Sequence, residues 1–202
     1  MKKSMLLFAC LSVSLVTLAD GRFSPFGISI STSSAAGQDS QFPGRQDYVY
    51  GWRFAVFSAA HKRMVGLATA VFANDDNSVY GGDVGGLQVA SIFNTASNAE
   101  LGLWQLAGFH NKVGSGCNGL HLCVFYNLAY GYFNGLQLAL RNEAKSDYAG
   151  AQVGLFNEGN TVMGTQIGLI NTARSLKGMQ IGLMNFVEES VMTAFPVIRI
   201  GW

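Results

Sequence analysis

Hydrophobic and polar residues alternate along the second half of the chain, in a pattern that recurs at a nearly constant step. In residues 176–185 (LKGMQIGLMN), Met179 and Ile181 fall on one face of an extended segment and Gln180 falls on the other. Alternation with a period of two is typical of a β-strand that has one apolar face. The pattern therefore predicts strands, and no segment after residue 20 has a helical period long enough to predict a helix.

The repeat unit is Gly-x-Gln-[Val/Ile]-Gly-Leu-x-Asn, which is clearest at residues 150–157, 164–171 and 178–185. More divergent copies extend upstream to about residue 86. The Gln-type positions are Gln88, Gln105, His121, Gln137, Gln152, Gln166 and Gln180, and their spacing shortens from 17 to 14 residues. Asn opens each short connection, as is favoured in tight turns. We therefore expect one tandem repeat array over about residues 86–185.

These features lead us to expect an all-β fold, an up-and-down antiparallel β-barrel of about twelve short strands built from 14–17-residue repeats. A 14-residue unit leaves about 9–11 residues for a strand, which is the length that crosses a bilayer with tilt. The Ile/Leu/Met face would meet lipid, and the narrow Gly/Gln face would fill the interior. A terminal strand at 195–202 has Ile198, Ile200 and Trp202 on one face and is similar to the last strand of outer-membrane barrels.

The same repeat fits an alternative, a parallel β-solenoid in which each unit is one coil and identical positions stack. Ladders of Gln and Asn would then form hydrogen bonds along the stack, which explains the identity of the repeats better than a barrel does. Against the solenoid, each unit must hold two strands and two corners. The segment TARSLK at 172–177 has neither Gly nor Pro to make a corner. The terminal strand tips the balance toward the barrel.

The first residues of the chain predict export. Lys2 and Lys3 precede an apolar stretch at 5–19 that ends on small residues, which is the layout of a signal peptide. We expect residues 1–19 to be this signal and residues 20–202 to form a single domain at the bacterial outer membrane or cell surface.

Composition supports contact with lipid. Charged residues make up 12% of the chain, and the formal net charge is +1. So few charges indicate much apolar surface that is buried or faces a lipid bilayer, here the outer membrane. The charge balance gives no reason to expect a nucleic-acid partner.

His110, Cys117, His121 and Cys123 are the strongest candidates for metal binding, because imidazole and thiolate are zinc ligands. Their spacing matches none of the usual CxxC patterns, so we expect no metal site. A disulfide between the two cysteines would need a turn at residues 118–119 to bring them within reach. Two free, partly buried thiols are the favoured interpretation.

Candidate catalytic residues are equally sparse. Asp75 and Asp76 are adjacent, as are Glu188 and Glu189, and neighbouring strand residues point to opposite faces. His61 lies in a solvated turn. We therefore predict no catalysis and no cofactor, and a structural or interaction role. A secreted repeat scaffold or adhesin-like solenoid is the alternative function, and a narrow pore is a minor one.

The segments GAQVGLFN (150–157), GTQIGLIN (164–171) and GMQIGLMN (178–185) together resemble a family of bacterial surface-repeat proteins. The segment VYGWRFAVFS (49–58) is similar to the strand that precedes such repeats. The resemblance covers roughly residues 49–185 and implies a secreted or outer-membrane surface protein without catalytic residues. One copy, GLHLCVFYN, departs from the pattern, since it has His121 in place of Gln and one extra residue.

Overall fold

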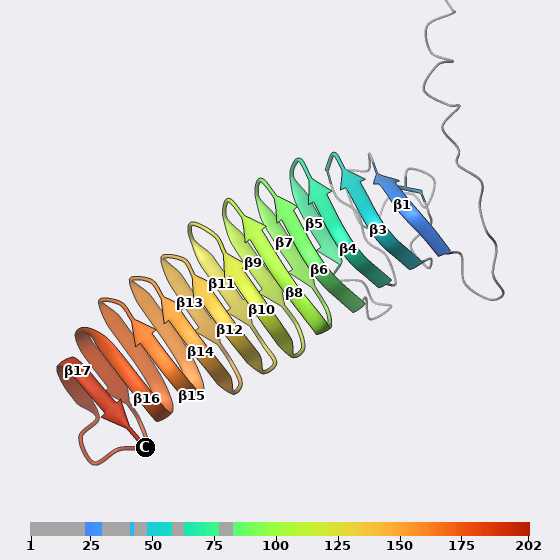
Figure 1. Cartoon of the computed structure of the whole chain (residues 1–202). Helices are drawn as coiled ribbons and strands as arrows, with labels where there is room; N and C mark the ends of the chain where they lie inside the picture. The colour runs from blue at the N-terminus through green and yellow to red at the C-terminus, as the bar shows by residue number, and fades with distance from the viewer. Residues whose placement is uncertain (1–22, 30–40, 43–47, 58–62, 77–82) are drawn as a thin grey trace, which may run out of the picture.

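A computed structural model describes residues 23–29, 41–42, 48–57, 63–76 and 83–202 of the chain. These residues form a parallel β-solenoid of about eight turns, whose coils lie side by side along one axis (Figure 1). The predicted signal at residues 1–19 lies outside the described residues. No described helix has the length and apolar character needed to span a membrane.

The coils have two sides, which we call the Gln side and the Asn side after the polar residue that each buries. The Gln side contains β1 (Phe23–Ser29), β3 (Tyr48–Ala55), β4 (Arg63–Ala70), β6 (Asp83–Ala90), β8 (Ala99–Ala107), β10 (Cys117–Leu122), β12 (Phe133–Leu138) and β14 (Tyr148–Val153). The Asn side contains β5 (Ala73–Asp76), β7 (Phe93–Ala96), β9 (His110–Val113), β11 (Tyr126–Ala129) and β13 (Arg141–Ala144). The long strands β15 (Phe156–Ile167) and β16 (Ile170–Val187) run through both sides. The short β2 (Gln41–Phe42) and the final β17 (Ala194–Gly201) pair antiparallel with β1 and β16.

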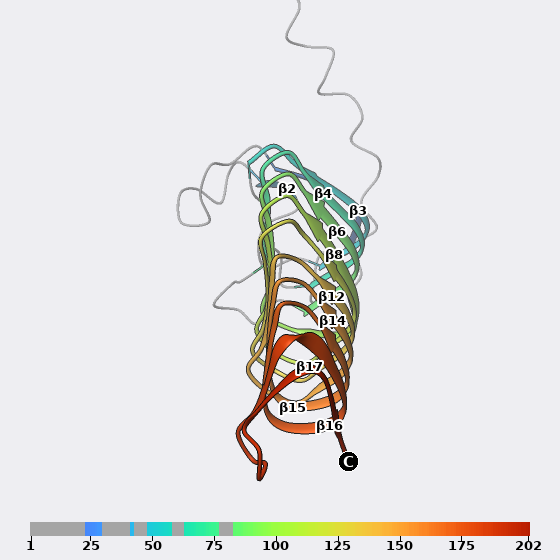
Figure 2. The same cartoon turned by 90° about the vertical axis from the view of Figure 1, so that its left-hand side faces the viewer.

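Neighbouring coils pair in parallel and in register. Gln152 pairs with Gln166, which pairs with Gln180, and Asn157 pairs with Asn171. Parallel stacking places the same residue of each repeat at the same position in every coil, so one favourable side chain is favourable in all of them. Viewed from the C-terminal end, the coils lie behind one another around a narrow interior (Figure 2).

The expected antiparallel β-barrel is therefore wrong, and the alternative, the parallel β-solenoid, is the observed fold. A 14-residue unit holds two strands because its corners use little chain. One corner is at Gly168 and Leu169, and the other, at Arg174, lies within the continuous strand β16. The described strands do not form a transmembrane β-barrel, and in these coils the Gln side chains, such as Gln166, are fully buried where the prediction of a pore had them line a channel.

Both glycines of the repeat are required by close packing between coils. Gly164 has a φ of 146°, and a Cβ atom there would lie 2.1 Å from the carbonyl oxygen of Gly150. At the corner, a Cβ atom on Gly168 would lie 2.6 Å from Nδ2 of Asn157. A side chain at either position would push neighbouring coils apart.

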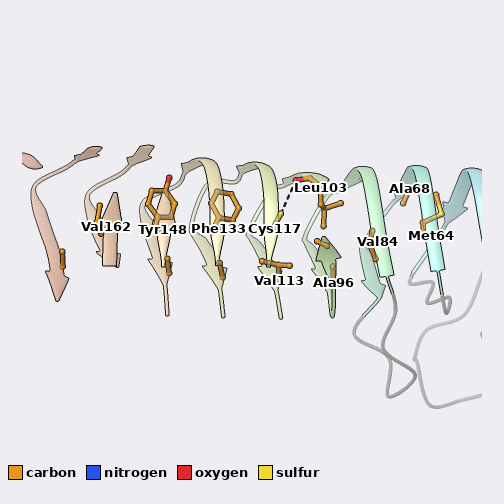
Figure 3. Packing of buried hydrophobic residues seen from close by; sticks show 14 of the residues in the cluster. Met64, Ala68, Val84, Ala96, Leu103, Val113, Cys117, Phe133, Tyr148 and Val162 are labelled. Atoms are coloured by element: carbon orange, nitrogen blue, oxygen red, sulfur yellow. Dashed lines mark hydrogen bonds between the residues drawn. The ribbon is translucent and has the colours of Figure 1, made fainter. Parts of the chain in front are cut away.

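The apolar part of the core is a single stack of side chains that runs along the axis (Figure 3). It begins with Val49 and includes Phe133 and Tyr148, whose rings stack at a centroid distance of 5.6 Å. Small residues such as Ala144 and Ala173 face this stack from the Asn side. The interior is therefore narrow, and polar ladders fill the rest of it.

Candidate functional site

A ladder of buried Asn side chains runs the length of the Asn side. Each Nδ2 donates a hydrogen bond to Oδ1 of the next Asn toward the C-terminus, at 2.8–3.0 Å. The members are Asn74, Asn94, Asn111, Asn127, Asn142, Asn157, Asn171 and Asn185. The buried guanidinium of Arg53 donates to Oδ1 of Asn74 at 2.9 Å, which completes the N-terminal end. These amides satisfy one another, so they serve the fold.

A second ladder, of Gln side chains, runs in the opposite direction. Nε2 of Gln166 donates to Oε1 of Gln152, and Nε2 of Gln180 donates to Oε1 of Gln166, both at 2.7 Å. His121 occupies one position of this ladder and interrupts it. Within the described structure, Oε1 of Gln105, Nε2 of Gln137 and Nδ1 of His121 are buried without a hydrogen-bond partner.

The predicted metal-ligand candidates are only partly brought together. Nε2 of His121 lies 3.7 Å from Sγ of Cys117, whereas His110 lies on the Asn side. Cys123 donates to Oδ1 of Asn127 at 3.2 Å, and both cysteines are free thiols. Burial lowers the pKa of His121 to about 3 and raises the pKa of Cys117 to about 12, so both are neutral at pH 7. In the described part of the chain, no three His, Cys, Asp or Glu residues are placed to hold a metal.

Two of the candidate carboxylates, Asp75 and Glu189, have side-chain partners in the structure. Asp75 accepts a hydrogen bond from Oγ1 of Thr95 at 2.6 Å. Glu189 forms an exposed ion pair with Arg174 at 2.9 Å. His61 lies outside the described residues. These contacts show how the side chains stabilise neighbouring coils, and they give no reason to assign them a chemical role.

The outer face of the Gln side is unusual, because uncharged and mostly apolar side chains point away from the core along two rows. The first row is Phe26, Trp52, Leu67, Leu87, Trp104, Leu120, Leu136, Ala151, Thr165, Met179 and Ile200. The second row is Ile28, Phe54, Thr69, Val89, Leu106, Leu122, Leu138, Val153, Ile167, Ile181 and Ile198. Every position in these two rows is uncharged. We call this surface the apolar face.

Many side chains of the apolar face are open to solvent. Trp104 is 56% exposed, Leu138 45%, Ile167 42% and Ile200 63%. The rows run from β1 to β17, so at about 4.8 Å per strand they measure roughly 50 Å. A contiguous apolar surface of this extent marks an interaction site on a protein surface. The apolar face is therefore our candidate functional site.

The Asn side, in contrast, carries charged residues on its outer face. Arg141 forms ion pairs with Glu143 and Glu158, and Lys145 also contacts Glu143. Burial acts to raise the pKa of Glu143, but hydrogen bonds from Lys145 and Tyr126 outweigh it and lower that pKa. The solenoid is thus two-sided, with an apolar face opposite a partly charged one.

Sequence reasoning found the apolar strand positions, such as Met179 and Ile181, but placed them on a closed barrel. It missed the exposed apolar residues at the corners between the Gln side and the Asn side, where Leu169 and Ile170 both point outward. The recurring Gly-Leu of the repeat was the sequence signal for these corner residues.

No protein-family model, curated protein or solved structure matches this chain. The resemblance to surface-repeat proteins therefore stays a prediction.

Proposed function

We propose that the chain is an exported, non-catalytic repeat scaffold that attaches to the surface of a lipid bilayer through its apolar face. The repeat scaffold is the function predicted as the alternative, and its attachment to a bilayer, with the Asn side left facing water, is added to it by this proposal. The observation that carries the proposal is the pair of uncharged rows on an outer surface. Removal of apolar area from water contributes about 25 cal/mol per Å² and favours such attachment.

The exposed tryptophans support a bilayer as the partner. Trp52 and Trp104 lie in the first row, and Trp202 follows β17 at the end of the same face, 98% exposed. Tryptophan is enriched where membranes meet water, since its ring is apolar and its N–H is polar. Without Lys2 and Lys3 of the predicted signal, residues 20–202 have 11 basic and 12 acidic residues, a formal net charge of −1 that gives no strong repulsion from anionic lipids.

The proposed export and the proposed structural role are supported by the sequence and by the interior of the solenoid. The basic start and the apolar stretch at residues 5–19 support export to the cell surface. A structural role is supported by the interior, where the polar groups of Asn157 and Gln166 hydrogen-bond to their counterparts in neighbouring coils.

Vesicle flotation tests the proposal directly. The mature chain is mixed with phosphatidylethanolamine–phosphatidylglycerol vesicles and centrifuged through a density gradient. We expect it to float with the vesicles. The paired substitution Leu67→Glu and Trp104→Glu places two charges on the apolar face and should lower the floating fraction about tenfold or more.

A matched control variant also introduces two glutamates, but it places them on the Asn side. Phe156 and Ile170 are neighbours in register and are 48% and 38% exposed on the Asn side. The variant Phe156→Glu with Ile170→Glu should float like the unaltered protein. Failure to float, together with a dimer in light scattering, would instead assign the apolar face to a second copy and overturn the proposal.

A further inference from the structure

An open groove of about 820 Å³ runs beside the second row of the apolar face, along the corner that leads to the Asn side. This volume lies within the range of about 300–1,000 Å³ that is typical of small-molecule sites. Its lining consists of apolar side chains and glycines from five neighbouring coils and from β17, and it includes no charged residue. The groove is therefore apolar along its whole length.

Four of the five coils each build one cross-section of the groove from three consecutive residues, and the first coil contributes Cys123 and Val124. In the coil of β15, Ile167 forms one wall, Leu169 forms the other, and Gly168 lies between them. A Cβ atom on Gly168 would point inward, toward the Asn ladder, so only backbone is present at the floor. The [Val/Ile]-Gly-Leu part of the repeat is thus wall, floor and wall.

The groove has two definite ends. Toward the N-terminus, the second wall is lost because its positions are occupied by Ser91 and Gly108. Toward the C-terminus, Val197 of β17 lines the last part. The five coils between these ends give a length of roughly 20 Å at about 4.8 Å per coil. The hydrocarbon thickness of one leaflet, which is half of the bilayer's about 30 Å, is less than the length of the groove.

The backbone of the floor excludes an extended peptide as the occupant. The N–H of Gly154 donates to the carbonyl oxygen of Ile167, and the N–H of Gly168 donates to that of Ile181. The N–H of Leu169 likewise donates to Leu155. A peptide strand in the groove would find no free N–H donor at Gly154, Gly168 or Leu169, so its own carbonyl groups would stay unpaired there. A hydrocarbon chain has no such groups to satisfy.

We propose that the groove binds one acyl chain of a phospholipid from the bilayer to which the apolar face attaches. The inference rests on the proposed function and adds a specific lipid site to it. The groove and the apolar face are continuous, because Leu138, Val153, Ile167 and Ile181 belong to both. An acyl chain can therefore lie along the corner while its headgroup stays at the membrane surface.

Photo-crosslinking tests this site. The protein is bound to phosphatidylcholine vesicles that contain a phosphatidylcholine with a diazirine on its acyl chain, and the adducts are mapped by mass spectrometry after irradiation. We expect adducts to concentrate on the groove segments of residues 138–140, 153–155 and 167–169. Leu169→Asp, on an exposed wall, should lower these adducts about tenfold while flotation is retained.

Met163→Asp is the matched control, since Met163 is also 44% exposed and lies in the same coil outside the groove. This variant should keep the groove adducts. Flotation with adducts spread evenly over the apolar face would overturn the lipid site and leave the proposed function intact. Absence of both flotation and adducts would overturn the proposed function itself.

Discussion

Nδ2 of Asn157 donates a hydrogen bond to Oδ1 of Asn171 at 2.8 Å, and both side chains are buried. The same amide donates to the carbonyl oxygen of Ile167, so one side chain joins two coils and both sides of the solenoid. Buried amides are costly when they are unpaired, and here each is satisfied by its counterpart in a neighbouring coil together with a backbone carbonyl. This relationship explains why Asn recurs at one position of every repeat.

Asn157→Leu should destabilise the protein by about 2–4 kcal/mol, because it leaves Oδ1 of Asn171 without its donor and leaves Nδ2 of Asn142 with the carbonyl oxygen of Val153 alone. Chemical denaturation followed by circular dichroism measures the loss. Asn134→Ala is the control, since Asn134 forms an equivalent but exposed contact with Asn118. A similar loss of stability in both variants would contradict the role given to burial.

His121→Gln should stabilise the protein by about 1–2 kcal/mol. A glutamine there can donate to Oε1 of Gln105 and accept from Nε2 of Gln137, which both lack partners. The gain exceeds the edge contact of about 0.5–1.5 kcal/mol that is lost with Phe133, whose ring centroid is 4.6 Å from that of His121. His121→Leu fills space without restoring the ladder, and it should not stabilise. An unchanged denaturation midpoint for His121→Gln would contradict the interrupted ladder.

Stability should fall in acid below about pH 6.5. Burial lowers the pKa of His121 from 6.5 to about 3, so the unfolded chain binds more protons than the folded one between these values. The stability that neutral His121 contributes is full above 6.5 and is lost toward pH 3, by up to about 1.4 kcal/mol per pH unit. His121→Gln should remove most of this slope, and denaturation at a series of pH values checks it. An identical slope in both proteins would assign the acid sensitivity to other groups such as Glu143, whose pKa is also lowered.

Gly164→Ala should destabilise strongly, by about 2 kcal/mol or more, because its φ of 146° and the oxygen of Gly150 both exclude a Cβ atom. Ala151→Val, on the outer face of the adjacent coil, is the control and should change stability little. Thermal unfolding of the two variants distinguishes packing between coils from a general sensitivity of this region.

The faces of the strands could be predicted from the sequence, but the direction of their pairing could not. Alternation separates Gln180 from Met179 and Ile181 whether neighbouring strands are parallel or antiparallel. The near identity of the repeats was the signal for parallel stacking, because only in-register coils bring Gln166 against Gln180. The resemblance of the C-terminal strand to that of a barrel outweighed this signal. In the structure, β17 instead pairs antiparallel with the last coil.

The corners of the coils were the second feature of the fold that could not be predicted from the sequence. Arg174 turns the chain within a continuous strand and has no Gly or Pro beside it, so no turn signal marks the corner. The apolar face followed from composition only in part. Low charge indicated apolar surface that is buried or faces lipid, but the placement of an exposed apolar surface on one side depends on the fold.

The attachment of the apolar face is tested most directly by the fluorescence of a single tryptophan in vesicles. With Trp52→Phe and Trp202→Phe, only Trp104 remains, on the apolar face. A second protein carries Phe156→Trp on the Asn side and phenylalanine at all three native tryptophan positions. We predict that bromine-labelled acyl chains quench Trp104 and that aqueous iodide quenches the tryptophan at position 156. Equal quenching of both by iodide in the presence of vesicles would contradict attachment through the apolar face.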